Sequence, residues 1–395
     1  MNSRERMLAA ISGGRPDRVP LSFMIFNALR SRTAGWRDFV ETSLAMGLDP
    51  VVDLAQVHPE VPAEHNDAHG VPVHFDAEVV TREWREPAGF APYPVLHKEY
   101  ITPSGTLTVA VNQTEDWLRG DHVPFLDDYI EPRAQKFPVA GPDDLPALKH
   151  LLARPADETI RRCHEAWAQP RALAAERGLL LSGGWGIGMD SAGWLMGLTN
   201  AVLAAVDDPD FLAAYLAVIE QWNRWRMEVI LDAGVDLFVR RGWYEGTSFW
   251  SPGLYRRFLL DGLKREVQMA HQAGAKFGYI MTVGALQFVD MLLEADVDVV
   301  IGVEDVQDHG MDLAAMKAAV AGRMGLWGGV NGFVTIEDGA DDQIRAATRG
   351  AIEALGPDGF ILSPVDNIRD TSAETWRKTQ LFIDTWKAAT APAGA

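Results

Sequence analysis

The sequence predicts an α/β fold, a single (β/α)8 TIM barrel, and three observations support this prediction. The chain has 395 residues, 47% of them hydrophobic, and such a barrel takes about 250 residues, or more than about 400 when its loops are extended. From about residue 143, helical segments alternate with short apolar runs, as in a parallel sheet covered by helices. Two further apolar runs near the N-terminus bring the number to eight. An open, doubly wound sheet is the alternative, but we find no Gly-x-Gly-x-x-Gly turn to support it.

The elements follow in order from capping and breaking residues. A helix at residues 4–12 begins after Asn2 or Ser3, which can accept hydrogen bonds from its first turn, and Gly13-Gly14 ends it. A second helix at residues 36–46 ends at Gly47. The eight predicted strands are residues 19–23, 50–54, 179–182, 237–239, 276–281, 297–303, 325–327 and 359–362.

An N-terminal insertion interrupts this pattern at about residues 75–112. Residues 78–85, 95–102 and 106–111 alternate between apolar and polar side chains, and Thr102-Pro103-Ser104-Gly105 reads as a tight turn. Alternation around such a turn predicts an antiparallel hairpin rather than barrel strands. No linker separates two parts of the chain, so we expect a single domain at residues 1–387 and a disordered tail at residues 388–395.

Charge and cysteine content exclude several classes of partner and site. The formal net charge is −19 without a stripe of Lys and Arg, so nucleic acid and anionic membranes are not expected as partners. No apolar run reaches the roughly 18 residues of a membrane span, and the charged N-terminus is no signal peptide, so we expect a cytoplasmic protein. Cys163 is the only cysteine, which excludes an intramolecular disulfide and a cysteine-rich metal site.

Reacting groups of a barrel enzyme lie at the carboxyl ends of the strands, and one predicted strand ends in two arginines. Arg240 and Arg241 directly follow residues 237–239, and Trp243 and Tyr244 come next. Burying two adjacent guanidiniums costs free energy unless a nearby anion pairs with them. One interpretation is a clamp for a substrate carboxylate or phosphate with an aromatic wall. The other is an internal salt bridge, for example to Glu304 or Asp305.

Other strand ends supply candidate acid–base and orienting groups. Tyr279 could donate a hydrogen bond to a developing oxyanion or a leaving oxygen, or simply pack in the barrel. Glu304 could act as general acid or base with a raised pKa, or cap a helix. Four further candidates are polar or aromatic residues that follow strands and could orient a substrate, cap the next helix or stack on a flat ligand: Asp366, Asn367, Asn331 and Trp185.

Residues 58–74 contain four histidines and three acids, enough to bind a metal. Their spacing matches no metal motif, and two prolines break any common helix face. We therefore interpret this segment as a surface loop, and we expect no metal ligands.

Four stretches of sequence, in order, match the motifs of one known family. They are Ser3-Arg4-Glu5-Arg6 with Arg15-Pro16-Asp17-Arg18-Val19-Pro20; Phe249-Trp250-Ser251-Pro252 followed by Tyr255 and Phe258; Trp327-Gly328-Gly329-Val330-Asn331; and Phe360-Ile361-Leu362-Ser363-Pro364. Over most of its length the chain resembles the uroporphyrinogen decarboxylase superfamily. The resemblance implies a TIM barrel and a homodimer. It is less specific for chemistry, because the superfamily contains decarboxylases and methyltransferases.

The methyltransferases of this superfamily that act on thiols bind zinc through a His-x-Cys pair after one strand and a later Cys. Depending on a one-residue choice of alignment, the pair falls on Tyr279 and Met281 or on Ile280 and Thr282, and the later Cys falls near Val365. None of these side chains is a thiolate or an imidazole, so the resemblance predicts a branch without the thiolate zinc site.

The decarboxylases of the superfamily need an arginine-rich N-terminal segment and an aspartate that contacts pyrrole nitrogens. Residues 22–32 contain Arg30 and Arg32, though not in the family's Arg-x-x-Gly-Arg arrangement, and Asp53 could hold the place of the aspartate. The family's Gly-His-Gly strand is replaced by Ser363-Pro364-Val365. A tetrapyrrole with eight carboxylates is therefore not the expected substrate.

Our leading hypothesis is methyl transfer from a small anionic or aromatic methylated substrate, for which the resemblance implies a corrinoid or tetrahydrofolate as acceptor. The chain shows no cobalamin-binding domain, so a corrinoid would arrive on a partner protein. In this hypothesis Arg240 and Arg241 bind an anion, Tyr279 and Glu304 are acid–base groups, and Asp366 and Asn331 orient the substrate. A metal-independent decarboxylase and a non-catalytic ligand-binding barrel remain as alternatives.

Overall fold

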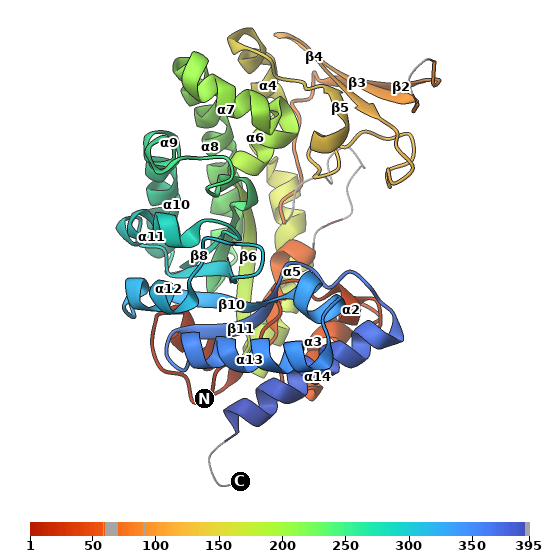
Figure 1. Ribbon diagram of the computed structural model, residues 1–395. Coiled ribbons are helices and arrows are strands. Elements are labelled where there is room, and N and C mark those ends of the chain that lie inside the picture. The colour runs from red at the N-terminus through yellow and green to blue at the C-terminus, as the bar shows by residue number, and fades with distance from the viewer. Residues whose placement is uncertain (58, 60–69, 90–91, 392–395) are drawn as a thin grey trace. The chain divides into compact units, whose positions relative to one another are not determined.

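The computed structural model describes residues 1–57, 59, 70–89 and 92–391 (Figure 1). The chain forms two compact units. Met1–Val57, Trp167–Gly183 and Gly234–Ala395 make up the parallel-sheet unit, and His58–Ala166 with Gly184–Ala233 make up the antiparallel-sheet unit.

The parallel-sheet unit is built on seven strands in the order β1-β6-β7-β8-β9-β10-β11. They are β1 (Val51–Asp53), β6 (Leu180–Ile187, which continues into the other unit), β7 (Leu237–Arg241), β8 (Lys276–Ile280), β9 (Val299–Val303), β10 (Gly325–Asn331) and β11 (Phe360–Val365). Strand β9 is buried at every position, as are β10 and β11. This is the burial expected for strands covered on both faces. The predicted α/β class and seven of the eight predicted strands are thus confirmed.

The eighth predicted strand, at residues 19–23, forms an isolated parallel bridge between Leu21 and Leu362 instead of a strand. The amide of Ser22 donates to the carbonyl of Leu362 at 3.1 Å, and the amide of Leu362 donates to the carbonyl of Pro20 at 2.9 Å. On its other side, Leu21 accepts a hydrogen bond from the amide of Asp49, just before β1, at 2.9 Å. Pro20 has no N–H to extend the ladder, which explains why the pairing stops here.

Two aspartates fasten the amino ends of neighbouring strands in the same way. Asp236 precedes β7 and accepts a hydrogen bond from the amide of Leu181 in β6 at 3.0 Å. Asp298 precedes β9 and accepts one from the amide of Phe277 in β8 at 2.8 Å. Each carboxylate therefore bonds a backbone amide of the preceding strand, at the end opposite to the candidate site.

The parallel-sheet unit contains nine α-helices in the described residues. They are α1 (Ser3–Ile11), α2 (Asn27–Arg30), α3 (Trp36–Ala45), α9 (Pro252–Phe258), α10 (Leu260–Gln272), α11 (Ala285–Glu294), α12 (Leu313–Val320), α13 (Asp341–Leu355) and α14 (Ala373–Thr390). Asn2 caps α1 as predicted, because its side chain accepts from the amide of Glu5 at 2.8 Å and Glu5 accepts from the amide of Asn2 at 3.0 Å. Helix α14 extends to Thr390, three residues into the segment predicted as a tail.

The antiparallel-sheet unit contains four strands in the order β2-β3-β4-β5: β2 (Val80–Glu86), β3 (Val95–Thr102), β4 (Gly105–Asn112) and β5 (Ala134–Lys136). Thr102 pairs with Gly105 across the predicted turn. The antiparallel insertion is thus confirmed, and β5 adds a short strand that sequence patterning did not predict. The helices here are α4 (Leu145–Leu151), α6 (Met189–Met196), α7 (Leu198–Asp207) and α8 (Pro209–Asp232), while α5 (Asp157–Arg177) runs from this unit into the other.

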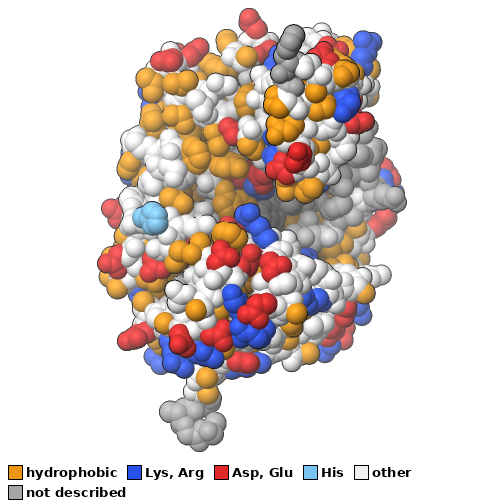
Figure 2. All heavy atoms as spheres, turned by 45° about the vertical axis from the view of Figure 1, so that its right-hand side comes forward, with side chains coloured by type: hydrophobic (Ala, Val, Ile, Leu, Met, Phe, Trp, Pro, Cys, Tyr) orange, Lys and Arg blue, Asp and Glu red, His pale blue; other side chains and the backbone are white. Residues whose placement is uncertain are grey.

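On the face shown in Figure 2, acidic and basic side chains are interspersed rather than separated by sign. Within the described part of the chain, no helix is both long and apolar enough to cross a membrane.

Candidate functional site

The two arginines predicted at a strand end are the last residues of β7, and both are buried, with 5% and 4% of their surface exposed. The guanidinium of Arg240 is bonded on both sides: Nη1 donates to Glu266 in α10 and Nη2 to Glu245, each at 2.7 Å. Burial alone would lower the pKa of Arg240, but the two carboxylates outweigh it and raise that pKa well above its usual value. Arg240 thus forms an internal salt bridge, with Glu245 and Glu266 as partners rather than Glu304 or Asp305.

Two tyrosines complete this buried cluster. The hydroxyl of Tyr279, in β8, donates to the second carboxylate oxygen of Glu245, and the hydroxyl of Tyr255, in α9, donates to the hydroxyl of Tyr279 at 3.1 Å. Burial, followed by the charge of Glu245, raises the pKa of Tyr279 well above its usual value, so this phenol stays protonated. We call Arg240, Glu245, Glu266, Tyr255 and Tyr279 the Arg240 network.

Local sequence explains how the network assembles. Glu245 lies in the short 3-10 helix η5 (Trp243–Glu245) that directly follows β7. A side chain on Gly242 would place its Cβ 2.6 Å from the ring of Tyr279 and 2.8 Å from the carbonyl oxygen of Ile280, so only glycine lets η5 approach β8 this closely. Ser251 caps α9, and Tyr255 on that helix is buried.

The aromatic residues predicted beside the arginine pair have separate neighbours. The guanidinium of Arg241 lies 4.4 Å from the ring centre of Trp243, a cation–π contact. The ring of Tyr244 packs edge-on against Phe249, with the ring centres 5.8 Å apart. The aromatic wall predicted beside Arg241 is therefore present for Trp243, and its role in ligand binding stays a prediction.

Asp53 ends β1 and shares a polar cluster with the neighbouring strand. One of its oxygens accepts from the hydroxyl of Ser182 in β6 at 3.1 Å and from the amide of Ala55 at 3.0 Å. Burial raises the pKa of Asp53, against these hydrogen bonds and the charge of Arg30. Arg30 itself lies over the ring of Phe39 at 4.5 Å, and its burial lowers its pKa. Among the described residues, no hydrogen-bond partner is found for this guanidinium, and the charge of Asp53 acts on it.

Glu304 follows β9 and is completely buried. Its carboxylate accepts hydrogen bonds from the backbone amides of Val306 at 2.7 Å and Gln307 at 3.0 Å. Burial raises its pKa despite these donors. These amides lie in the bend at residues 305–307, and Asp312 caps the next helix, α12. Glu304 therefore holds a turn and not the helix predicted, and its acid–base role stays a prediction.

Asn331, at the end of β10, begins the π-helix η6 (Gly332–Glu337), and its side-chain oxygen accepts from the amide of Val334 at 2.7 Å. Its side-chain nitrogen is buried, and in the described structure it has no hydrogen-bond partner. Asp366 follows β11 with a positive φ of 64° and accepts from the amide of Asn367 at 2.7 Å. Both strand ends therefore carry polar groups, as predicted.

Two predicted features lie partly outside the described residues. The backbone of Trp185 lies in β6, but its side chain lies outside the described residues. The histidine-rich segment at residues 58–74 also falls largely outside them.

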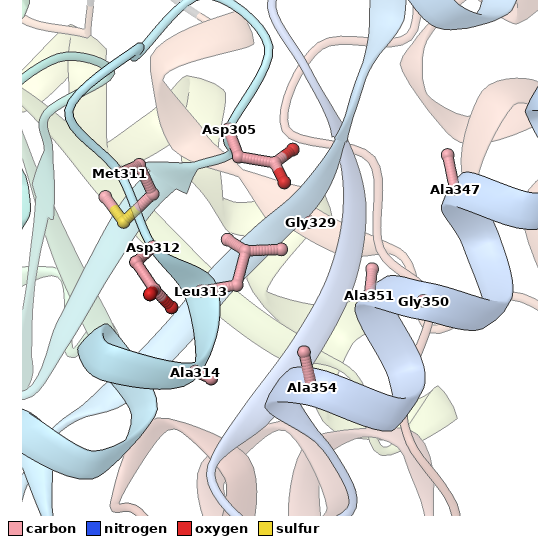
Figure 3. Close-up of a pocket in the computed structure, with 10 residues that line it drawn as sticks. All are labelled: Asp305, Met311, Asp312, Leu313, Ala314, Gly329, Ala347, Gly350, Ala351 and Ala354. Carbon is pink, nitrogen blue, oxygen red and sulfur yellow. The ribbon is translucent and has the colours of Figure 1, made fainter.

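A cleft of about 480 Å³ lies beside α12 and α13 (Figure 3). Small residues of α13 form one wall, and Asp305 and Asp312 lie on the other side of the opening. Its lining residues are Asp305, Met311, Asp312, Leu313, Ala314, Gly329, Ala347, Gly350, Ala351 and Ala354. Sequence analysis gave no signal for this cleft, because its wall is made of alanine and glycine.

The residues at the expected zinc positions do not fit a thiolate zinc centre. The hydroxyl of Tyr279 is bonded within the Arg240 network, and Met281 is a buried thioether. Within the described ranges, no three His, Cys, Asp or Glu side chains converge as metal ligands.

Comparisons with known proteins define the family. The solved structure of a methyltransferase from Methanosarcina mazei is similar over 98% of this chain and 99% of its own, with a TM-score of 0.59 and 14% identity, which shows a shared fold. Two other solved structures are more distant. A protein of Sinorhizobium meliloti 1021 has a TM-score of 0.38 and 14% identity, over 60% of this chain and 87% of its own. A B12-independent methionine synthase from Shewanella sp. W3-18-1 has a TM-score of 0.38 and 11% identity, over 55% of this chain and 63% of its own. No curated protein sequence matches. The family model described as uroporphyrinogen decarboxylase (URO-D) matches residues 125–369, more than half of the chain, and the chain therefore belongs to the uroporphyrinogen decarboxylase family.

Proposed function

We propose that this protein is an enzyme that transfers a methyl group from a small anionic or aromatic methylated substrate to a separate acceptor. The acceptor is tetrahydrofolate or a corrinoid bound to a partner protein. The reaction takes place at the carboxyl ends of the strands of a (β/α)8 barrel, in which residues 19–23 take the eighth position.

The observation that carries this proposal is the hydrogen bond between Tyr279 and Glu245 beside Arg240. A phenol with a raised pKa stays protonated at neutral pH. Its one O–H donates to Glu245 in this structure, so in the proposed reaction Tyr279 turns that hydrogen from Glu245 to the departing oxygen. When a methyl group leaves an ether oxygen, the electrons of the carbon–oxygen bond stay on that oxygen. A positioned donor stabilises the resulting charge.

Other residues are assigned to substrate binding, acid–base chemistry and substrate orientation. Arg241, whose guanidinium lies over Trp243, and Arg30 near Asp53 are the side chains assigned to an anionic substrate. Glu304 is a buried carboxylate with a raised pKa, and it is the second acid–base candidate. Asp366 and Asn331 are the orienting groups. The likeness to a methyltransferase over nearly the whole length of both chains supports the fold on which this proposal rests.

Decarboxylation without a metal is the second candidate, and the Arg30–Asp53 pair favours it. Arg30 could hold one carboxylate, while a protonated carboxyl group, such as Asp53 with its raised pKa, donates a proton to the carbanion left by carbon dioxide. The two reactions differ in which bond of the substrate breaks.

A doubly labelled substrate separates them. Purified protein is incubated with methoxybenzoates that carry ¹³C in both the methyl and the carboxyl group, with tetrahydrofolate or a reduced corrinoid protein present. Methyl transfer predicts label on the acceptor and an intact ¹³C-carboxylate in the demethylated product. Release of ¹³CO2 with the methyl group retained would instead establish the decarboxylase.

A further inference from the structure

Three residues of the antiparallel-sheet unit lie in a line that the proposed function does not use. The hydroxyl oxygen of Ser104 is 3.0 Å from Nε2 of His150, and Nδ1 of His150 is 2.7 Å from a carboxylate oxygen of Asp76. Ser104 lies in the two-residue turn between β3 and β4, His150 in α4, and Asp76 shortly before β2. Three separate segments therefore converge on one serine hydroxyl.

The carboxylate of Asp76 decides which ring nitrogen carries the proton. A carboxylate this close to Nδ1 accepts a hydrogen bond, so the neutral ring holds its hydrogen on Nδ1. The lone pair of Nε2 then faces Ser104, whose hydroxyl donates to it. Nucleophile, base and orienting carboxylate thus have the arrangement of a Ser-His-Asp triad, which is recognised by geometry rather than by order in the chain.

The backbone around the three residues is fixed as well. The amide of Asp76 donates to the carbonyl of His150 at 2.9 Å, so these two residues are joined by a backbone hydrogen bond as well as by the contact between carboxylate and imidazole. In the turn, the hydroxyl of Thr102 donates to the carbonyl of Gly105 at 2.8 Å and accepts from the amide of Ser104 at 3.1 Å. The side chain of His150 is 23% exposed, while Ser104 is exposed. The nucleophile is therefore open to a reagent, and its base is partly shielded.

We propose that Ser104 is an activated nucleophile that accepts acyl groups from small esters, a catalytic site independent of the strand-end site. Its hydroxyl oxygen attacks the ester carbonyl carbon and its proton passes to Nε2 of His150. The bond to the leaving alcohol breaks, and the alcohol departs with that proton. Water then attacks the acyl-serine with His150 as base, releasing the carboxylic acid and restoring Ser104.

The same geometry limits the class of ester. The amide of Ser104 is already bonded to Thr102, so it does not stabilise an oxyanion. The loss of one such donor costs about 10²–10³ in rate, while a positioned general base contributes about 10²–10⁴. The site therefore acts on esters with a good leaving group, such as aryl acetates, and not on amides.

The test uses p-nitrophenyl acetate with the full-length protein and mass spectrometry of its peptides. We expect a burst of nitrophenolate and an acetyl group on Ser104. The Ser104→Ala substitution removes both, and Asp76→Asn slows the burst by about 10²–10⁴-fold because the ring loses its orienting carboxylate. Ser12→Ala, a change of an exposed serine that ends α1, leaves the burst unchanged.

The position of the acetyl group in the unsubstituted protein decides the matter even where a variant folds poorly. Acetyl on Ser104 no more often than on Ser12, or a burst that survives Ser104→Ala in folded protein, would overturn the proposal. The contact between Ser104 and His150 would then only fasten the turn to α4.

Discussion

The guanidinium of Arg240, in β7, lies 2.7 Å from the carboxylate of Glu266, in α10, and both side chains are buried. A helix that covers the sheet thereby supplies a charge to the strand end at which Glu245 and Tyr279 meet. The cluster holds its own counter-charges, so it positions groups at the site without needing a bound anion.

Replacing Arg240 with methionine should destabilise the protein strongly. The change leaves Glu245 and Glu266 buried without their cation, and breaking a buried pair in this way costs about 3–5 kcal/mol. Urea unfolding of the purified variant measures the loss. As a control, Arg161→Ala removes an exposed arginine of α5 that pairs with Glu158 and Glu165, and it should change the free energy of unfolding little. Equal, small losses in both variants would contradict the account of the network.

Tyr279→Phe should lower kcat more than it changes KM, because it removes a donor that matters most when charge develops in the transition state. We expect a loss of about 10²-fold or more. Tyr255→Phe keeps the hydrogen bond from Tyr279 to Glu245 and should cost less. The methyl-transfer assay measures both variants. A larger loss of kcat for Tyr255→Phe than for Tyr279→Phe would contradict the choice of Tyr279 as the acid.

The acid dependence of stability should involve Glu83 in the antiparallel-sheet unit. Burial opposes its charge, but His122, Lys98 and the amide of Val123 lower its pKa from 4.5 to about 2. A carboxyl whose pKa is lowered by folding stabilises the fold at pH values above its pKa in the unfolded chain. That contribution is lost as the pH falls through its pKa in the folded protein. Stability supplied by Glu83 is thus present above about pH 4.5 and lost toward pH 2. Unfolding midpoints of Glu83→Gln should be lower at neutral pH and should depend less on pH in this window.

The exposed Glu78 provides the control, since Glu78→Gln should retain the acid dependence of the unsubstituted protein. Identical pH profiles for Glu83→Gln and the unsubstituted protein would show that this carboxyl does not titrate as described.

Two Gly→Ala substitutions should have opposite effects. In Gly242→Ala the new methyl would lie 2.6 Å from the ring of Tyr279, and such overpacking costs about 1–3 kcal/mol. In Gly350→Ala, in α13, the methyl meets no atom beyond its own stretch of helix within 4 Å, and alanine in place of glycine favours a helix by about 0.5–1 kcal/mol. Thermal unfolding measures both changes, and a loss of stability in Gly350→Ala would contradict the space described there.

Patterning predicted the sheet well because each strand is a short apolar run bounded by turn residues. It placed Arg240, Tyr279 and Glu304 at or beside strand ends, but their partners depend on tertiary packing. Glu266 lies within a charged helix, where a glutamate normally reads as a solvated residue. Ser104, His150 and Asp76 come from three segments whose approach no local pattern records. Residues 19–23 had the composition of a strand, yet Pro20 limits their pairing to a single bridge.

The most direct test of the central claim is transfer of a ¹³C-labelled methyl group from a methoxylated aromatic acid to the acceptor, followed by NMR. Unsubstituted protein and Glu245→Gln are compared at equal concentrations of folded protein. The account predicts label on the acceptor with the unsubstituted protein and a rate lower by about 10²-fold or more with Glu245→Gln. Absence of label on every acceptor tested, or an equal rate in Glu245→Gln, would contradict a methyl transfer that depends on the Arg240 network.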